Sequence, residues 1–364
     1  MPSPTSRSTA CTLLALPAFV AGLVLAPVGA SADTDPNGQA NGHTNTNGNG
    51  NTNGAASPNG NANGPVTPGL RVHDGRIVDA NGRDVVMRGV NHPHAWYRQE
   101  RQSIDDIAAL GADTVRVVLS SGDYWERIPA GEVSSIVGQC QDNGLICVLE
   151  VHDTTGYGDN DQAVPLDRAV DYWVDIQDVL HGEEDNVVIN IGNEPHGNSN
   201  AQDWTHDTVE AVERMRAEGF EHALMVDAPN WGQDWSHTMR DNADAVFAAD
   251  PHDNTIFSIH MYGVYEEADT VYSYLGDFVD AGLPLVVGEF GHEHSDSTPD
   301  EDAILAAAEE YGIGYLGWSW SGNSGGVEYL DMVYDFDSDH LTDWGERIFH
   351  GENGIAETAD RPGC

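Results

Sequence analysis

The chain has 364 residues, 40% of them hydrophobic and nine of them tryptophan, which is enough apolar material for one large folded core. Its formal net charge at pH 7 is −45, and the sequence contains no lysine, so all fifteen basic residues are arginine. A surface of this charge repels nucleic acid and anionic membranes, which argues against both as partners. Because acidic residues occur in nearly every segment, we interpret the charge as a halophilic adaptation to concentrated salt; an ordinary acidic secreted protein is the alternative.

The first 32 residues have the features of a signal peptide. Arg7 precedes an apolar stretch at 13–28, and Ala30-Ser31-Ala32 has the small-x-small pattern of a cleavage site. Two prolines interrupt the apolar stretch, which is also short for a membrane span. The sequence therefore predicts a secreted, extracellular protein cleaved before Asp33, without a membrane anchor.

Residues 33–65 differ in composition from the rest of the chain. Between residues 33 and 64 there are ten asparagines and seven glycines, with no aromatic and no branched aliphatic side chain. Such a segment cannot bury apolar surface, so we predict a disordered linker. Residues 66–350 are then expected to form one catalytic domain, and residues 351–364 a C-terminal tail.

Strand-like and helix-like segments alternate through the predicted domain. A hairpin is expected at 70–78 around Asp74-Gly75, a pair that favours the positive φ of a tight turn, and it would close the floor of a barrel. Helical periodicity is found at 104–110, 166–180, 204–218 and 301–311. Apolar runs typical of buried parallel strands are found at 85–90, 114–119, 145–151, 187–191, 223–227, 256–260, 285–289 and 314–320.

This alternation predicts an α/β fold, the (β/α)8 or TIM barrel with an N-terminal β-hairpin, as a single catalytic domain. An open doubly wound sheet is the rival fold, but no glycine-rich phosphate loop follows the first strand.

Polar side chains lie at or near the carboxyl ends of these strands. In a (β/α)8 barrel these ends meet at the catalytic mouth, so the side chains are expected to converge. Glu194 and Glu289 are two carboxylates among them, and such a pair can cleave a glycosidic bond when one protonates the leaving oxygen and the other attacks the sugar carbon. The other residues of interest at strand ends are Arg116, His152, Asn193, Asp227, Trp231, His260, Tyr262, Trp318 and Trp320.

The ordered set of motifs resembles glycoside hydrolase family 5 over about residues 69–349. The resemblance implies a retaining double displacement, with Glu289 as the nucleophile and Glu194 as the acid and then the base. Strings such as Val151-His152-Asp153-Thr154-Thr155-Gly156 and Gly317-Trp318-Ser319-Trp320-Ser321-Gly322-Asn323 are similar to the bacterial β-mannanase branch of that family. The shorter matches are Arg116, His152, Asn193-Glu194-Pro195, His260-Met261-Tyr262 and Gly288-Glu289-Phe290.

Elementary electrostatics agrees with this division of roles. Arg116 and the hydroxyl of Tyr262 would hold Glu289 as a carboxylate, which a nucleophile requires. The negative charge of Glu289 would in turn favour the protonated form of Glu194. Asn193 is the expected donor to the sugar 2-hydroxyl, a hydrogen bond that strengthens in the transition state.

The histidines and tryptophans are expected to position the substrate. His152 and His260 would orient the catalytic groups and the sugar. Trp318 and Trp320 share one face of the last predicted strand, and Trp320 is nearer its carboxyl end. We therefore predict Trp320 as the platform on which a sugar ring stacks, and Trp318 as a deeper core residue. Trp231, Trp96 and Tyr265, in loops at the same end, are each expected either to stack on a further ring or to pack within the loop.

Catalysis by two carboxylates requires no cofactor, and no Cys/His spacing resembles a zinc site. The loop at 291–302 contains Asp296, Asp300 and Glu301, which are candidate ligands of a structural Ca2+ ion. Plain surface charge is the alternative explanation for these acids.

Cys140 and Cys147 are candidates for a disulfide across Asn143-Gly144, since an exported protein permits such bridges. Spacing alone does not decide whether the geometry allows the bond, and Cys364 would be left unpaired.

The resemblance implies an endo-acting β-1,4-mannanase that hydrolyses internal bonds of mannan, glucomannan and galactomannan, and we expect it to be secreted and monomeric. A family 5 β-1,4-glucanase (cellulase) is the nearest alternative, because the catalytic set is shared. An inactive carbohydrate-binding protein is an alternative of another class, although both glutamates and Arg116 are intact. These residues do not determine how well an acceptor sugar competes with water in transglycosylation.

Overall fold

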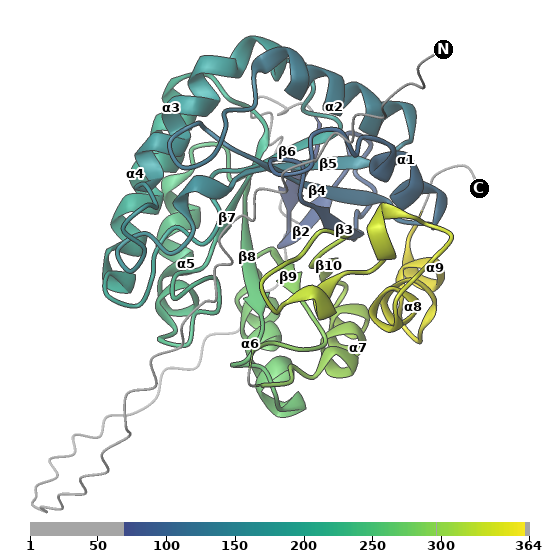
Figure 1. The fold of residues 1–364 in the computed structure, drawn as a ribbon. Coiled ribbons are helices and arrows are strands. Elements are labelled where there is room, and N and C mark those ends of the chain that lie inside the picture. The colour runs from purple at the N-terminus through teal and green to yellow at the C-terminus, as the bar shows by residue number, and fades with distance from the viewer. Residues whose placement is uncertain (1–68, 296, 361–364) are drawn as a thin grey trace, which may run out of the picture. The chain divides into compact units, whose positions relative to one another are not determined.

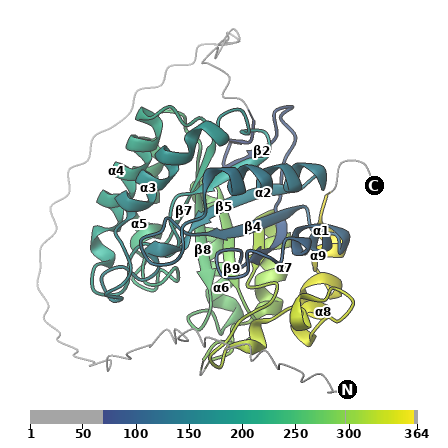
Figure 2. The ribbon, with the colours of Figure 1, turned by 45° about the horizontal axis from the view of Figure 1, so that its top comes forward.

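The computed structural model describes residues 69–295 and 297–360. Eight parallel strands form a closed barrel in the order β10-β3-β4-β5-β6-β7-β8-β9, and helices surround it (Figures 1 and 2). The predicted (β/α)8 barrel is confirmed. The barrel strands are β3 (Arg88–His92), β4 (Thr114–Leu119), β5 (Ile146–Val151), β6 (Val187–Asn190), β7 (Ala223–Asp227), β8 (Thr255–Met261), β9 (Leu285–Phe290) and β10 (Gly314–Gly317).

The helices are amphipathic, with apolar side chains at i, i+3, i+4 and i+7 facing the barrel. In α3, for example, Leu166, Ala169, Val170 and Trp173 are buried. The helices are α1 (Gln102–Ala109), α2 (Ala130–Asp142), α3 (Leu166–Ile176), α4 (Trp204–Ala217), α5 (Thr238–Ala249), α6 (Ala268–Ala281), α7 (Glu301–Tyr311), α8 (Asp343–His350) and α9 (Ile355–Thr358).

The predicted hairpin is present as β1 (Arg71–His73) and β2 (Arg76–Val78), paired antiparallel. Asp74 and Gly75 have positive φ values of 49° and 73°, as a tight hairpin turn requires. Leu70 and Ile77 pack with apolar side chains of the barrel interior, so the hairpin closes one end of the barrel.

Both faces of the barrel strands are packed against apolar groups. Each strand therefore appears in the sequence as a continuous apolar run. In β6, Val187 and Ile189 pack outward in the layer beneath the helices, and Val188 packs in the barrel interior. The next interior position of β6 is Asn190, and Met225 of β7 is likewise followed two residues later by Asp227. Along each of these strands the interior positions therefore change from apolar to polar toward the carboxyl end.

Two barrel strands differ clearly from their predicted bounds: the strand predicted at 85–90 is β3 (Arg88–His92), and the last strand ends early. The sequence predicted a strand at 314–320, but β10 ends at Gly317 and the Trp318–Ser319 peptide bond is cis. Trp318-Ser319-Trp320 continues the apolar alternation of a strand, which is why the pattern did not mark the end.

The chain continues to pack against the barrel after residue 350, where we had placed the end of the catalytic domain. Ile355 of α9 is buried, and Arg88 Nε donates a hydrogen bond of 2.9 Å to Thr358 Oγ1. The predicted signal peptide (1–32) and linker (33–65), together with Cys364, lie outside the described residues.

Cys140 on α2 and Cys147 on β5 are buried free thiols in this structure. Burial and a hydrogen bond between the two thiols raise the pKa of Cys147 well above its usual value. Among the described residues, no helix is both long and apolar enough to cross a membrane.

Candidate active site

Arg116 lies beneath the mouth of the barrel and organises the polar layer. It is fully buried on β4, where its interior position would otherwise hold an apolar side chain. One guanidinium nitrogen, Nη1, donates to Glu289 Oε1 at 2.7 Å. The remaining N–H groups bond to Asn91 Oδ1 (2.8 Å), Asn190 Oδ1 (2.9 Å), Asn193 Oδ1 (2.8 Å) and Asp227 Oδ2 (3.2 Å).

Glu289, at the end of β9, is held by hydrogen bonds to both of its oxygens. Arg116 donates to Oε1, and the Tyr262 hydroxyl donates to Oε2 at 3.0 Å. Burial raises the pKa of Glu289, and the positive charges of His260 and Arg116 oppose that rise. A carboxylate buried this deeply would hold its proton without such cations, so they allow it to act as a nucleophile.

The burial of Tyr262 and the negative charge of Glu289 both raise the pKa of the tyrosine well above its usual value. Tyr262 therefore keeps its proton and remains a hydrogen-bond donor to Glu289.

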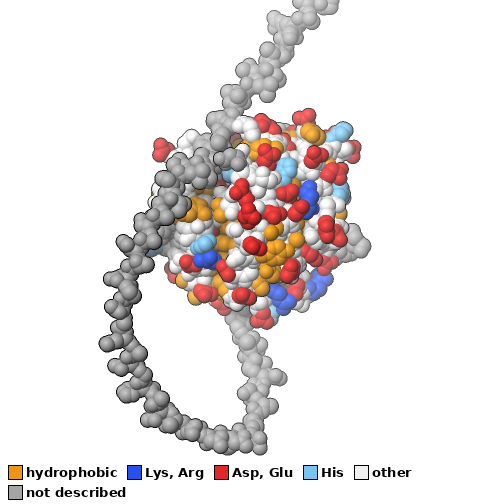
Figure 3. All heavy atoms as spheres, turned by 90° about the horizontal axis from the view of Figure 1, so that it is seen from below, with side chains coloured by type: hydrophobic (Ala, Val, Ile, Leu, Met, Phe, Trp, Pro, Cys, Tyr) orange, Lys and Arg blue, Asp and Glu red, His pale blue; other side chains and the backbone are white. Residues whose placement is uncertain are grey.

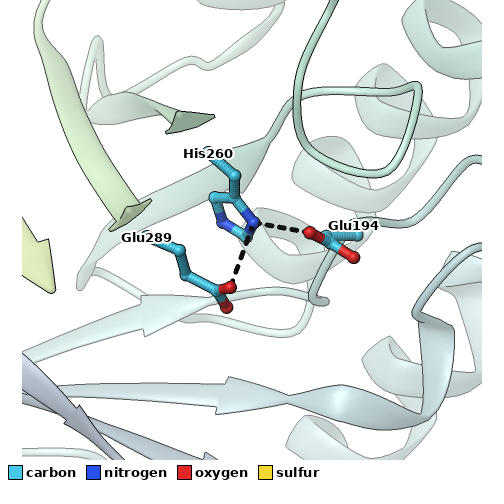
Figure 4. Close-up of side chains that lie close together, drawn as sticks. All are labelled: Glu194, His260 and Glu289. Carbon is cyan, nitrogen blue, oxygen red and sulfur yellow. Dashed lines mark hydrogen bonds and ion pairs between the residues drawn. The ribbon is translucent and has the colours of Figure 1, made fainter. Parts of the chain in front are cut away.

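His260 connects the two glutamates (Figure 4). Its Nδ1 lies 2.8 Å from Glu194 Oε1 and 3.6 Å from Glu289 Oε2. Its Nε2 lies 3.3 Å from Asp227 Oδ2. A register shift between Ile259 and His260, where β8 pairs with β9, aims this ring into the mouth.

Glu194 follows β6 in a left-handed backbone conformation, with a φ of 41°. Such a conformation costs about 1–3 kcal/mol for a residue with a side chain and is concentrated at functional sites. The backbone N–H of Glu194 donates to Asp227 Oδ2 at 3.2 Å, so the same carboxylate that faces His260 also fixes this turn.

The spacing of the two carboxylates identifies the kind of chemistry. A carboxylate oxygen of Glu194 and one of Glu289 lie within 4.8 Å of each other. Retaining glycosidases have their two carboxyl groups about 5–5.5 Å apart, whereas inverting enzymes need about 6.5–9.5 Å to admit a water molecule. Oxygens within 4.8 Å of each other fit the shorter of these two spacings, that of the retaining enzymes.

His260 is expected to be an imidazolium at neutral pH. Burial lowers its pKa, but the negative charges of Glu289 and Asp227 outweigh burial and raise the pKa to about 10. The folded-state pKa lies above the ordinary value of about 6.5, so protonated His260 stabilises the fold fully below pH 6.5. This contribution is lost as the pH rises through about 10.

We therefore expect the difference in free energy of unfolding between the wild type and His260→Asn to be largest at about pH 6.5 and to shrink as the pH rises toward 10. Urea unfolding across this range measures the difference. A difference that stays constant with pH would show that His260 is not charged in the folded protein.

An aromatic wall extends from the glutamates along one side of the mouth. His152 Nδ1 bonds to Glu150 at 2.9 Å, and its ring stacks on Trp318 with centroids 5.7 Å apart. Trp96 meets His152 edge-on at 5.1 Å. Trp125 lies 5.3 Å from Trp96 and stacks on Tyr124 at 4.0 Å. The three tryptophans are partly exposed, so the wall offers ring faces to a sugar chain.

The prediction that Trp320 is the stacking platform is wrong. Trp320 is fully buried and packs edge-on against Phe349 of α8, out of reach of a ligand. Trp318 is the exposed member of the pair, and its indole N–H donates to Asn323 Oδ1 at 3.0 Å. The two-residue alternation that we used holds only within a strand, and β10 ends at Gly317, before either tryptophan.

The two tryptophans should respond differently to replacement by alanine. Trp318→Ala is expected to lower kcat/KM about tenfold, mainly through KM, because a stacking contact contributes about 0.5–1.5 kcal/mol. Trp320→Ala leaves a cavity and is expected to cost about 3–5 kcal/mol of stability. Steady-state kinetics and thermal unfolding of both variants separate the roles; a larger kinetic loss in Trp320→Ala at equal folding would contradict them.

Asn193 and Trp231 both contact the loop that follows β5. Asn193 Nδ2 donates to Thr155 Oγ1 at 2.8 Å, which leaves its second N–H for a ligand. The partly exposed Trp231 packs over Gly156, where a Cβ would come within 2.3 Å of the indole ring. Its indole N–H donates to Asp159 Oδ2 at 3.1 Å.

Arg116 contacts Glu289 and His260 contacts both glutamates, as the sequence led us to expect. Both are fully buried and bonded to other protein groups, so they position the glutamates rather than touch a sugar. Sequence reasoning missed Asn190, which bonds to both Arg116 and Asp227. The available signal was a lone amide at the end of an otherwise apolar run.

The candidate calcium ligands do not form a metal site in the described residues. Asp300 caps α7 by accepting a 3.0 Å hydrogen bond from the Ala303 N–H, and neither Asp300 nor Glu301 belongs to a group of three converging ligands. Asp302 of the same loop pairs with Arg347 at 2.7 Å. Asp296 lies outside the described residues, so the Ca2+ site stays a prediction.

A (β/α)8 barrel with two carboxylates at this spacing and an aromatic wall beside them defines a glycoside hydrolase. A family model described as cellulase (glycosyl hydrolase family 5) matches residues 78–324. The chain belongs to glycoside hydrolase family 5.

Curated relatives and solved structures are similar over most of the chain. A mannan endo-1,4-beta-mannosidase of Streptomyces lividans is 61% identical over 292 residues, 80% of this chain and 76% of that protein. A mannan endo-1,4-beta-mannosidase of Cellvibrio japonicus is 50% identical over 293 residues, 80% of this chain and 68% of that protein. The mannohexaose complex of Thermomonospora fusca beta-mannanase has a TM-score of 0.79 at 59% identity and covers 81% of this chain and 98% of that one.

Proposed function

We propose that the protein is an endo-acting β-1,4-mannanase that hydrolyses internal bonds of mannan, glucomannan and galactomannan with retention of configuration. The observation that carries the chemistry is the pair Glu194 and Glu289, held within 4.8 Å by His260 and Arg116. The similarity to mannan endo-1,4-beta-mannosidases supports the choice of substrate.

In the first step, an oxygen of Glu289 attacks the anomeric carbon while Glu194 transfers its proton to the glycosidic oxygen. The bond to the leaving sugar breaks, and a glycosyl ester forms on Glu289. Because Glu194 Oε1 already accepts from His260, the proton that is transferred is expected on Oε2.

In the second step, Glu194 acts as a base and removes a proton from water while the water oxygen attacks the same carbon. The ester bond breaks, Glu289 regains its negative charge and Glu194 regains its proton. Two inversions at one carbon retain the β-configuration. Asn193, with one amide N–H free, is placed to donate to the 2-hydroxyl during both steps.

A substrate panel followed by proton NMR tests the proposal. We expect reducing ends to appear from glucomannan and galactomannan, with a rapid fall in viscosity typical of internal cleavage and with β-anomers formed first. Cleavage of carboxymethylcellulose alone would favour the β-1,4-glucanase, which the family model's description also suggests. Failure to cleave any of the three would favour an inactive carbohydrate-binding protein.

The proposed mechanism needs no cofactor. The predicted structural Ca2+ in the loop at 291–302 is a separate proposal, checked by thermal unfolding with and without EDTA. Loss of stability in EDTA that added calcium restores would support it.

We further propose that the protein works outside the cell as a monomer in concentrated salt, with neither nucleic acid nor membrane as a partner. The N-terminal signal-like segment supports export, and the net charge of −45 supports the other points. Figure 3 shows acidic side chains spread over the face in view, with few arginines between them.

Because salt screens repulsion between these carboxylates, we expect mannan hydrolysis and the thermal midpoint to be maintained or raised in molar NaCl compared with dilute buffer. Activity and unfolding across a NaCl series measure this. Irreversible inactivation at high NaCl, with full activity in dilute buffer, would contradict salt adaptation.

A further inference from the structure

A second cluster of potential metal ligands lies outside the active site, on α4 in the outer ring of helices (Figure 1). His206, Asp207 and Glu210 each offer a ligand atom, and these atoms all lie within 4.8 Å of one another. His206 Nδ1 is 3.3 Å from Asp207 Oδ1, and its Nε2 is 3.5 Å from Glu210 Oε1. The helix places Glu210 beside both of the others, because residues three and four apart are neighbours on a helix surface, and His206 and Asp207 are adjacent in the chain.

A buried histidine behind the cluster gives an independent indication of a ligand. His196 is fully buried, and within the described residues neither of its ring nitrogens makes a hydrogen bond. Its Nε2 points at Asp207 Oδ2 from 3.5 Å. This ion-pair contact places the ring behind one oxygen of Asp207 and leaves the other oxygen for a metal ion, the position from which a group behind a metal site orients a ligand.

The cluster is accessible to a small ion from solvent. His206 and Glu210 line a hollow of about 770 Å3 between α4 and the start of α5, with Gln202 on the near side and Asn242 across it. A bound ion there could complete its coordination with water.

We propose that His206, Asp207 and Glu210 bind a divalent transition-metal ion of the zinc class, with His196 holding Asp207 in position. One imidazole nitrogen with two carboxylate oxygens suits Zn2+, whereas Ca2+ and Mg2+ prefer oxygen ligands throughout. The site is separate from the proposed catalytic residues and does not depend on the proposed substrate.

His340 provides a matched control for His206. Both side chains are 70% exposed and both face an aspartate, since His340 Nδ1 lies 2.7 Å from Asp337. Within the described part of the chain, however, His340 belongs to no group of three converging ligands. Replacing it removes the same amount of exposed imidazole without touching the proposed site.

Calorimetric titration of the full chain with Zn2+ in chelator-free buffer tests the proposal. The buried group Glu194, His260 and Glu289 is also a potential metal site, so the result is taken as a difference between variants. We expect the wild type and His340→Ala to bind one more equivalent of Zn2+ than His206→Ala. Glu210→Gln is expected to weaken that equivalent at least tenfold, and His206→Ala should hydrolyse substrate normally without added metal.

Identical titrations of the wild type and His206→Ala would overturn the proposal, as would an equal loss of binding in His340→Ala. Calcium binding that also required His206 would overturn the assignment to a transition metal.

Discussion

Replacing Glu289 by alanine is expected to lower the hydrolysis of mannan and of dinitrophenyl β-mannobioside, an activated aryl substrate, by about 10⁴-fold or more. This loss corresponds to about 5.5 kcal/mol of transition-state stabilisation. The cause is the same for both substrates, because without the carboxylate no glycosyl ester forms. Steady-state kinetics on the two substrates measures the losses, with circular dichroism to verify folding.

Glu194→Ala is the matched variant, and here the two substrates should differ. Mannan needs a proton on its leaving sugar, so its hydrolysis should fall as far as in Glu289→Ala. A dinitrophenolate leaves without a proton, so kcat/KM for the aryl substrate should fall by far less. Because the variant also lacks the base for the second step, a burst of dinitrophenol should precede a slow steady state. Equal losses on both substrates in both variants would contradict the division of roles.

Arg116→Lys is expected to lower kcat by about 10²-fold or more, because one ammonium cannot replace the several donors that hold Glu289, Asp227 and the surrounding amides. Loss of charge-assisted bonds to Glu289 also raises the pKa of that carboxyl group. The acidic limb of the kcat/KM profile should therefore move to higher pH, since Glu289 must be ionised to attack. Arg116→Leu, which leaves buried carboxylates unpaired, should cost about 3–5 kcal/mol of stability.

Arg216 on α4 serves as the control for Arg116. It is also buried, and it forms two hydrogen bonds to Asp250, of 2.8 and 2.9 Å, but none to the catalytic groups. Arg216→Lys should lower the thermal midpoint and leave the pH profile unchanged. If both variants shift the profile alike, or neither does, Arg116 does not act through Glu289.

The sequence was sufficient to predict the barrel, because strands with apolar side chains on both faces form continuous apolar runs in the sequence. The interior positions then become polar at one end, as Val188 gives way to Asn190 and Met225 to Asp227. Glu194 and Glu289 could be singled out because each lies at or just beyond the carboxyl end of such an apolar run, the end that forms the mouth of a (β/α)8 barrel.

The contact of Arg116 with Glu289 was predicted, but its bonds to Asn190 and Asp227 and the depth of His260 were not. The positions of Arg116 and His260 on their strands indicated that both side chains point into the barrel. How far below the mouth each side chain lies depends on the stagger of the strands and on the register shift before His260. The structure places both beneath the glutamates, where they fix charge and orientation.

Trp318 and Trp320 lie beyond the end of β10, where the two-residue alternation of a strand no longer predicts which side chains share a face. The apolar alternation continues after the hydrogen-bonded strand has ended at Gly317, and the chain turns so that the first tryptophan faces the mouth. In the aromatic wall, Trp96 was a candidate from the sequence, but its neighbours Trp125 and Tyr124 were missed because they come from a different loop.

Identification of the covalent intermediate tests the central claim most directly. A 2-deoxy-2-fluoro-β-mannobiosyl fluoride should form the glycosyl ester and hydrolyse it slowly, because fluorine destabilises both transition states. Mass spectrometry of the intact protein and its peptides should then find one mannobiosyl adduct, on Glu289. An adduct on another residue, or no adduct together with an inverted first product by NMR, would contradict the mechanism.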